Sequence, residues 1–179
     1  QEPPAASGVE APAARVLRAE LGPALKAVAD FRGDLAITVE RDAWVRAASL
    51  LRDHPELDFK LFLDLCGVDQ LDDDTDEGLR DRYDVVLHAY SVTHKHHVRL
   101  KTSAPEKSAA VPTLTGVYKG ANWFEREAWD LYGIEFTGHP KLERLLTHEA
   151  FVGHPMRKDY PVGQRHVERL ALPVAAVLH

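Results

Sequence analysis

Apolar residues in the first third of the chain recur at every third or fourth position in two segments, a spacing that predicts amphipathic helices. The first helix covers residues 15–29 and is kinked or split at Gly22 and Pro23, because proline removes a backbone donor and its ring clashes with the preceding turn. The second helix begins after Asp42, which can cap its free amides, and ends before Pro55. Two helical faces are therefore available to cover a core.

Other segments alternate between apolar and polar residues or form short apolar runs, and these predict strands. Residues 35–39 alternate, whereas residues 59–68 are mostly apolar and predict a buried strand. Residues 83–92 and 97–101 are expected to pair as an antiparallel hairpin, and a linker over residues 105–120 has room for one helical turn. This order predicts a single small α+β domain, with helices packed on a mixed, largely antiparallel sheet.

A short helix rich in charged and aromatic residues is predicted next. Asn122 can act as its N-cap, with Glu125 returning the bond three residues later in a capping box, and Gly133 suits the left-handed position after the last turn. Arg126 and Asp130 are four residues apart and can form an ion pair. Amphipathic aromatic side chains outside the apolar stripe are typical of contact surfaces. These are Trp123, Trp129 and Tyr132.

Prolines interrupt the chain after this helix and leave room for only one further helix, over residues 141–150. So long a segment with little regular structure is either disordered or functional, and its bulky side chains argue against disorder. We expect it to lie first on its own domain and further out on a partner chain. The predicted organisation is a flexible leader (1–12), the α+β domain (13–133) and an extended, partner-binding C-terminal arm (134–179).

Two blocks of this region resemble a known family signature. E-R-E-A-W-D-L-Y-G-I-E-F-T-G-H-P (125–140), R-L-L (144–146) and G-H-P-M-R-K-D-Y-P (153–161) are similar to the C subunit of bacterial NADH:quinone oxidoreductase, the thirty-kilodalton subunit family of respiratory complex I. Glu143 stands where the family usually has a basic residue, and Met156 where it usually has leucine. The motif residues expected at interfaces or in structural roles are Glu125, Arg126, Glu127, Asp130, Gly133, His139, Pro140, Arg144, Gly153, His154, Pro155, Arg157, Lys158, Asp159, Tyr160 and Pro161.

The resemblance implies a function that cannot be inferred from the individual residues alone. It implies a non-catalytic, cofactor-free subunit of the peripheral arm of a proton-translocating complex, which passes electrons from NADH through flavin and iron–sulfur clusters to quinone. The subunit would brace the quinone-site (D, forty-nine-kilodalton-type) subunit and neighbouring iron–sulfur subunits. It would lie peripherally on the cytoplasmic side of the cell inner membrane. An equivalent subunit of a related membrane-bound hydrogenase-type complex is an alternative.

Charge and cysteine content narrow the classes of function. A formal net charge of -6 argues against nucleic acid as the main partner, since phosphate binding needs a basic face. Cys66 is the only cysteine, so the chain cannot form an internal disulfide or supply all the thiolates of an iron–sulfur cluster. We expect Cys66 to be a small buried apolar residue. No apolar run is long enough to predict a transmembrane helix.

An acidic turn imitates a calcium-binding loop. Asp72, Asp74 and Asp76 have the spacing of its first three ligands, but Glu77 stands where the loop needs glycine, and Tyr83 stands where it needs a bidentate glutamate. We therefore interpret the segment as a solvated turn.

Histidines suggest two further sites. His94, His96 and His97 lie at the predicted hairpin tip, but only two of them share a face, too few ligands for zinc. A second group could serve a metal-dependent hydrolase, although its histidines mostly precede prolines. Its members are Glu125, Glu127, Asp130, His139, His148 and His154. We favour structural roles for both groups and predict no catalytic residue, bound cofactor or metal ligand in this chain.

Overall fold

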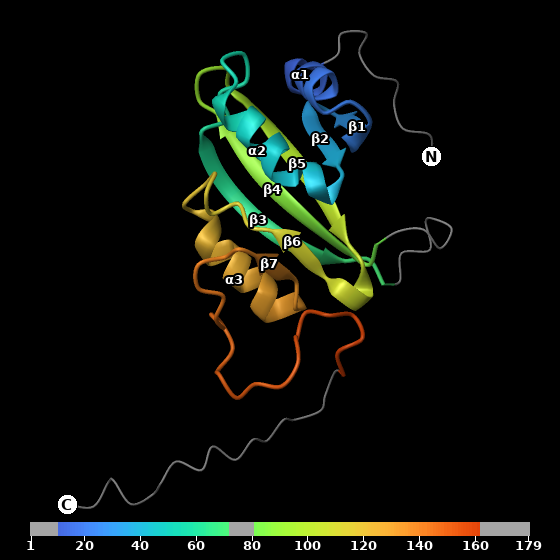
Figure 1. Cartoon of the computed structure of the whole chain (residues 1–179), viewed down its shortest axis with the longest axis vertical. Helices are drawn as coiled ribbons and strands as arrows, with labels where there is room; N and C mark the ends of the chain where they lie inside the picture. Colours follow the sequence, from blue (N-terminus) through green and yellow to red (C-terminus); the bar gives the residue numbers. More distant parts are fainter. Residues whose placement is uncertain (1–10, 72–80, 162–179) are drawn as a thin grey trace, which may run out of the picture.

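A five-stranded mixed sheet forms the centre of the protein (Figure 1). The structure is a computed structural model that describes residues 11–71 and 81–161. The strand order is β1-β2-β5-β4-β3, in which β2 and β5 run parallel and the other neighbours run antiparallel. The strands are β1 (Leu25–Phe31), β2 (Asp34–Val39), β3 (Leu61–Asp69), β4 (Tyr83–Ser91) and β5 (His96–Ala104).

In the described part of the chain, three α-helices accompany the sheet: α1 (Pro12–Leu21), α2 (Trp44–Asp53) and α3 (Ala121–Tyr132). Figure 1 shows α1 and α2 over one face of the sheet, and α3 beside β3 at its lower end. A second, two-stranded parallel sheet pairs β6 (Ala110–Pro112) with β7 (Glu135–Thr137). Single 3₁₀ turns occur at η1 (Gly22–Ala24), η2 (Arg41–Ala43) and η3 (Glu106–Ser108). The predicted α+β domain with helices on a mixed sheet is confirmed.

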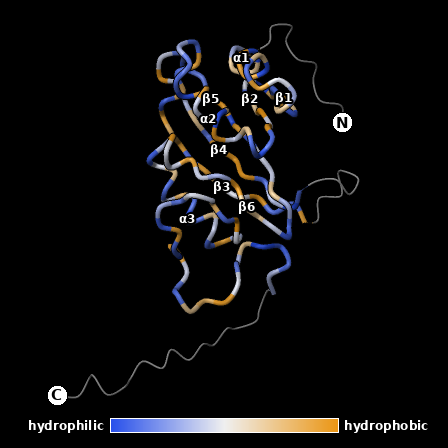
Figure 2. The backbone as a smooth tube through the Cα atoms, viewed as in Figure 1, coloured by the Kyte–Doolittle hydropathy of each residue, from blue (hydrophilic) through white to orange (hydrophobic). Residues whose placement is uncertain are grey.

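The core lies between α2 and the sheet face that it covers. Leu65, Leu87 and Leu100 from three neighbouring strands are fully or almost fully buried, as are Trp44 and Leu51 of α2. Figure 2 shows the hydrophobic residues concentrated along the central strands. Because successive strand residues point to opposite faces, one face of each strand supplies the core and the other remains outside it.

The first predicted helix is wrong in its second half. The helix ends at Leu21, where Gly22 adopts a positive φ of 54°, and residues 25–31 form β1 instead. Antiparallel pairing with β2 supplies the backbone hydrogen bonds of this segment. A helix could not supply them in the same way, because Pro23 has no amide hydrogen and interrupts helical hydrogen bonding. The second helix is confirmed over Trp44–Asp53, but Asp42 lies inside η2 and makes no cap hydrogen bond.

The strand predictions hold with one correction. The hairpin of β4 and β5 is confirmed. The segment predicted as a buried strand is β3, an edge strand, and its Leu61 and Leu63 are exposed. The linker contains β6 as well as the turn η3. The acidic turn over residues 72–80 lies outside the described residues, as do residues 1–10 of the leader and residues 162–179 of the arm.

Candidate functional site

The arm begins inside the domain. Ile134 and Phe136 are buried in the core, and β7 pairs with β6. The backbone N–H of Glu135 donates to the carbonyl of Ala109 at 2.6 Å. The first four residues of the predicted arm are therefore part of the α+β fold.

Beyond β7 the described arm, residues 138–161, forms neither helix nor strand. The helix predicted over residues 141–150 is absent, and the reason is visible in its amides. The N–H groups of Leu145, Leu146 and Thr147 donate to Oδ2 of Asp130 at 3.0, 2.7 and 2.9 Å. Three consecutive amides that converge on one carboxylate oxygen form an anion-binding nest, which replaces the hydrogen bonds of a helix.

Asp130 lies on α3 and is the centre of this arrangement. Besides the three amides it accepts hydrogen bonds from Nη1 of Arg144 at 2.7 Å and from Oγ1 of Thr147 at 2.5 Å. Its side chain is fully buried. Burial alone would raise its pKa, but the hydrogen bonds from Thr147 and the neighbouring amides hold the pKa well below the usual range for aspartate. The predicted pair between Asp130 and Arg126 is not formed, because the nest and Arg144 occupy the carboxylate.

Arg144 links the helix to the far side of the arm. Its Nη2 donates to the carbonyls of Phe151 and Gly153 at 2.9 and 3.2 Å. The guanidinium also lies 5.8 Å from the ring centroids of Trp129 and Phe151. Arg126 donates to the carbonyls of Glu143 and Arg144, both at 3.2 Å. Two arginines therefore hold the arm backbone through its carbonyls.

The end of α3 is capped by the arm as it returns. The carbonyl of Asp130 accepts from Nδ1 of His154 at 2.9 Å, that of Leu131 from the amide of Met156 at 3.0 Å, and that of Tyr132 from Nε of Arg157 at 2.6 Å. These are carbonyls that a helix end leaves without an internal partner, and a cation there also suits the helix dipole.

Gly133 makes this close approach possible. It has a φ of 76° in the left-handed region, as predicted for the residue after the helix. A Cβ built at this position would overlap with Nη2 of Arg157 and lie 2.7 Å from the ring of His154. Glycine is thus required both for the backbone conformation and for the space that the arm fills.

A charge cluster centred on a buried ion pair holds the last described turn of the arm. Arg82 donates to both oxygens of Asp69 at 3.0 and 2.9 Å, to Glu106 at 2.7 Å and to Asp159 at 3.0 Å. The amide of Lys158 donates to Oδ2 of Asp69 at 2.9 Å. The side chains of Arg82 and Asp69 are almost fully buried, so this pair is fixed by bidentate geometry away from solvent. Hydrogen bonding to Asp69 and Asp159 raises the pKa of Arg82.

Glu125 has a different role from the predicted capping box. The N-cap of α3 is Gly120, which has no side-chain cap bond, and Glu125 is fully buried. Its carboxylate accepts from Oγ1 of Thr113 at 2.5 Å and from the amide of Leu114 at 2.6 Å, and Nε2 of His139 lies 4.0 Å away. Burial raises the pKa of Glu125 to about 7, against the opposing effect of these two hydrogen bonds.

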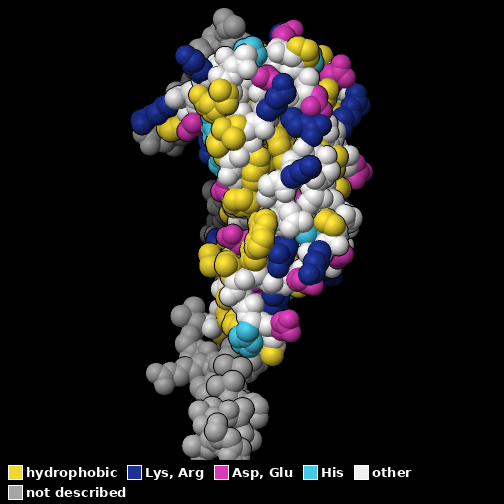
Figure 3. Space-filling model, turned by 90° about the vertical axis from the view of Figure 1, so that its left-hand side faces the viewer, with side chains coloured by type: hydrophobic (Ala, Val, Ile, Leu, Met, Phe, Trp, Pro, Cys, Tyr) yellow, Lys and Arg dark blue, Asp and Glu magenta, His cyan; other side chains and the backbone are white. Residues whose placement is uncertain are grey.

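Large apolar side chains point out from this well-anchored region. Figure 3 shows a column of hydrophobic side chains along one side of the molecule. Four large apolar residues of α3 and the described arm are more than half exposed. These are Trp123, Leu146, Val152 and Met156. Apolar groups presented on a fixed backbone are the composition of a protein–protein contact.

The remaining motif residues lie around the same anchors. Tyr160 Oη donates to the carbonyl of Val152 at 3.2 Å, and a Cβ at Gly153 would lie 2.8 Å from the Tyr160 ring. Nε2 of His139 donates to the carbonyl of Asn122 at 3.2 Å. Glu127, Pro140, Lys158 and Pro161 are exposed or partly exposed, and Pro155 is partly buried. The structure thus packs the second sequence block, residues 153–161, against the end of α3, which is part of the first block.

Sequence reasoning missed four residues of this site: Asp69, Arg82, Thr113 and Thr147. The partners that bring them into this site are between 12 and 89 positions away in the chain, so neither periodicity nor spacing indicates them. The one sequence feature that indicates a buried ion pair is the presence of charged residues next to the apolar runs of β3 and β4.

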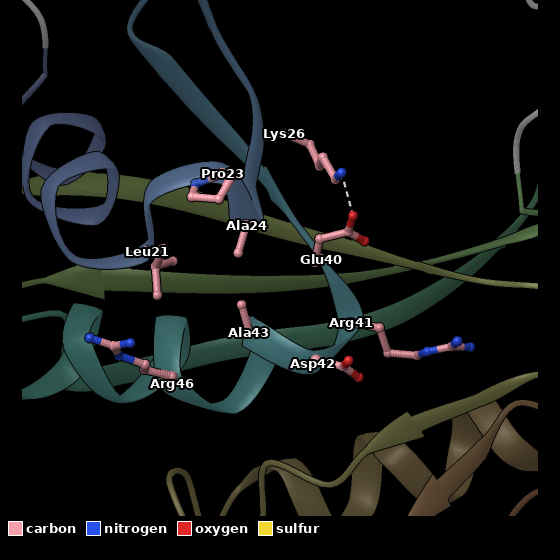
Figure 4. A pocket seen from close by; sticks show the side chains of 9 residues that line it. All are labelled: Leu21, Pro23, Ala24, Lys26, Glu40, Arg41, Asp42, Ala43 and Arg46. Atoms are coloured by element: carbon pink, nitrogen blue, oxygen red, sulfur yellow. Dashed lines mark ion pairs between the residues drawn. The ribbon is translucent and has the colours of Figure 1, made fainter.

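A surface pocket of about 680 Å³ lies elsewhere, between η1, the ends of β1 and β2, and the start of α2 (Figure 4). Lys26 and Glu40 form an ion pair across its rim, and Arg46 pairs with Glu20. No motif residue lines the pocket.

Over residues 11–71 and 81–161, no group of three or more His, Cys, Asp or Glu side chains could hold a metal ion. In the same part of the chain no helix is long and apolar enough to cross a bilayer.

Comparison with known proteins points to one family. Residues 37–166 match the family described as respiratory-chain NADH dehydrogenase, 30 Kd subunit. The C subunit of NADH-quinone oxidoreductase from Roseiflexus sp. (strain RS-1) is 46% identical over 151 residues, which cover 84% of this chain and 83% of the relative. The C subunit from Leptothrix cholodnii is 49% identical over 140 residues, covering 76% and 69%.

Solved structures share the fold. A trypsin-resistant fragment of Nqo5 superimposes with a TM-score of 0.59 at 26% identity and covers 72% of this chain and 98% of the fragment. A chain of an archaeal membrane-bound sulfane sulfur reductase gives 0.65 at 23% identity, covering 83% of each chain, which at this identity shows the fold alone. The family match and the relatives establish that this chain belongs to the family of the respiratory-chain NADH dehydrogenase 30 Kd subunit, as a subunit of NADH:quinone oxidoreductase.

Proposed function

We propose that this subunit braces the quinone-site (D) subunit of NADH:quinone oxidoreductase through its arm. The observation that supports the proposal is that the arm is irregular in structure and yet held in place by the domain. Residues 138–161 have no helix or strand, yet buried side chains of the domain hold them at several points. Leu146 and Val152 remain 62% and 66% exposed.

A fixed irregular segment suits such a role. Binding costs free energy when loops and side chains must be ordered at the interface, and an arm that is already held in place avoids much of this cost. Here Asp130, Arg144 and Arg82 supply the order from within the chain. The apolar side chains are left for the partner, with neighbouring iron–sulfur subunits as further contacts.

We further propose that this chain holds no redox group of its own. NADH, flavin, the iron–sulfur clusters and quinone would be bound by other subunits, and the chain would lie peripherally on the cytoplasmic side of the cell inner membrane. The single cysteine supports this, as do Asp130 and Glu125, whose carboxylates are occupied by hydrogen bonds from their own chain.

The alternatives have less support. A hydrogenase-type complex is not favoured, because the curated relatives are named as C subunits of NADH-quinone oxidoreductase. A metal-dependent hydrolase would need several free ligand atoms in one place. Both ring nitrogens of His139 are hydrogen-bonded to the backbone, and no group of three or more His, Cys, Asp or Glu side chains within the described residues could hold a metal ion.

The test changes the outer side of the arm and leaves its anchors intact. In the complete complex, Leu146→Asp combined with Val152→Asp should lower the amount of D subunit that co-purifies by about tenfold or more, since burying a charge in an apolar contact is costly. Val92→Asp is the matched control, because Val92 is 65% exposed but lies in the turn between β4 and β5. D subunit recovery that is equal in both variants would contradict the proposal.

A truncation provides a second test of the proposed contact with the D subunit. Removal of residues 141–179 spares Ile134 and Phe136, which the core requires. The shortened chain should keep the circular dichroism of the folded domain and lose the D subunit. A truncated chain that retains the D subunit at the level of the full chain would overturn the proposal.

A further inference from the structure

The five-stranded sheet has a second face that faces away from the core. Leu65, Leu87 and Leu100 point into the core, so their strand neighbours point the other way. In Figure 1 α1 and α2 lie over the core side. Of α3, Tyr132 meets the sheet at Gly67, which lies on the core side. We call the outward side the open face. It includes Leu61, Cys66, Val86, Tyr90, Arg99 and Lys101.

The half of the open face on β3 and β4 is mostly apolar. Leu61 lies opposite Tyr90 and Cys66 lies opposite Val86, and these apolar pairs form a strip that the polar pair of Asp64 and His88 interrupts. Leu61, Leu63 and Val68 are between 36% and 45% exposed. A bulge at residues 62–64 adds Leu63 to the strip.

The next strand, β5, adds positive charge. Arg99 and Lys101 point to the open face, beside His88 and Val86. Within residues 11–71 and 81–161 neither cation forms an ion pair, and Nε of Arg99 is buried without a hydrogen-bond partner. Carboxylates near this face have other neighbours: Asp84 accepts from Gln70 at 3.0 Å, and Asp64 lies opposite His88. Glu40, Asp81 and Asp84 line a pocket with Lys101 but form no ion pair with it, and none of these carboxylates accepts from Nε of Arg99. A buried guanidinium N–H without an acceptor is costly and points to an acceptor supplied from outside.

We propose that the open face is a second subunit interface, covered by an amphipathic helix of another subunit that sets its apolar side on the β3–β4 strip and directs a carboxylate to Arg99 and Lys101. A helix with side chains is about 10 Å across, the width of two strands, so it can cover the strip and reach β5. The chain covers the opposite face in the same way, with α2. The inference rests on membership of the complex and not on the role of the arm.

Cys66 is a natural reporter of this contact, because it is the only cysteine and lies on the strip. Burial raises the pKa of its thiol, so labelling with a maleimide is best done near pH 8. Labelling should be about tenfold or more slower in the intact complex than in the isolated full chain, since interface cores exclude solvent. Urea-denatured complex supplies the total reactive thiol. Equal labelling rates in the complex and the isolated chain would overturn the proposal.

Charge reversal tests the acidic partner. Arg99→Glu with Lys101→Glu should weaken retention of this chain in the complex by about thirtyfold, the effect of losing a buried charge pair. Arg15→Glu with Arg46→Glu makes the same change of charge on α1 and α2 and should leave retention unchanged. Circular dichroism of both variants establishes that they fold. If the β5 variant is retained as well as the control variant, the acidic helix is excluded.

The outcomes of these two tests can be distinguished from the outcomes of the tests on the arm. Arm variants should lose the D subunit while Cys66 stays protected wherever this chain is still bound to the complex. Loss of Cys66 protection with an intact D contact would contradict the open-face interface alone.

Discussion

Nη1 of Arg144 lies 2.7 Å from Oδ1 of Asp130, a carboxylate with no exposed surface, and the two residues are 14 positions apart. The other oxygen of Asp130 accepts three successive amides. One helix residue therefore determines the backbone of a loop that would otherwise have no regular hydrogen bonds. The arm depends on a charge in the domain as much as on its own sequence.

Asp130→Asn should destabilise the chain by about 3 kcal/mol, because it leaves Arg144 and the nest without their anion. Urea denaturation at pH 7 measures this. The difference from wild type should shrink as the pH falls below about 4, because a depressed folded pKa gives stability that is lost as the carboxylate is protonated. Glu127→Gln, a solvent-accessible change on the same helix, should alter stability by less than about 0.5 kcal/mol. Equal effects of the two substitutions would contradict the role of Asp130.

Gly133→Ala should displace the returning arm from the end of α3. The left-handed conformation costs a residue with Cβ about 1 kcal/mol, and the new methyl would also overlap with Arg157 and His154. We expect faster tryptic cleavage after Arg144 and Arg157, followed by mass spectrometry. Gly116→Ala is the control, since a Cβ there meets nothing within 4 Å. An unchanged cleavage rate in the Gly133 variant would contradict the proposed close packing.

The features that sequence predicted correctly are those fixed by neighbouring residues. The helix of Trp44–Asp53, the hairpin of β4 and β5, and the left-handed Gly133 all follow from periodicity or from the conformational limits of one residue. Residues 25–29 show the limit of such reasoning. Leu25 and Val28 fit a helical spacing, and only pairing with β2 shows that they form a strand.

The parts that sequence could not supply are contacts between distant segments. Glu125 had the spacing of a capping box, but its partner is the amide of Leu114 in the preceding loop. Asp130 had the spacing of a pair with Arg126, yet three amides and Arg144 outweigh one exposed helix pair. In both cases a local rule was satisfied by the sequence and overridden by burial.

Arg82→Lys should destabilise the fold by about 2 kcal/mol, although it keeps the charge. Lysine cannot make the two parallel hydrogen bonds that Arg82 donates to Asp69, and it cannot reach Glu106 and Asp159 at the same time. Hydrogen exchange should rise at the amides of residues 158–160 before the domain unfolds, because the amide of Lys158 also depends on Asp69. Arg46→Lys changes an exposed pair and should have little effect. No increase in exchange at the end of the arm would exclude this anchor.

Glu125 should make stability fall as the pH rises from about 4.5 to about 7. Its hydrogen bonds allow a neutral form, since the hydroxyl of Thr113 lies 3.0 Å from that of Thr115 and can donate there while it accepts from a protonated Glu125. His139 makes no hydrogen bond to Glu125, because its Nδ1 accepts from the amide of Lys141 and its Nε2 faces a carbonyl. Burial then favours the uncharged acid.

The sign follows from proton binding. The folded pKa is about 7 and the unfolded pKa is near that of free glutamate, so in this window the folded state binds more protons and loses stability with rising pH. Glu125→Gln removes this titration. Its stability relative to wild type, measured by urea denaturation, should therefore increase by about 3 kcal/mol between pH 4.5 and pH 8. Glu127→Gln should show no such trend. A difference between Glu125→Gln and wild type that is independent of pH would mean that Glu125 is ionised in the fold and held by Thr113 and Leu114 alone.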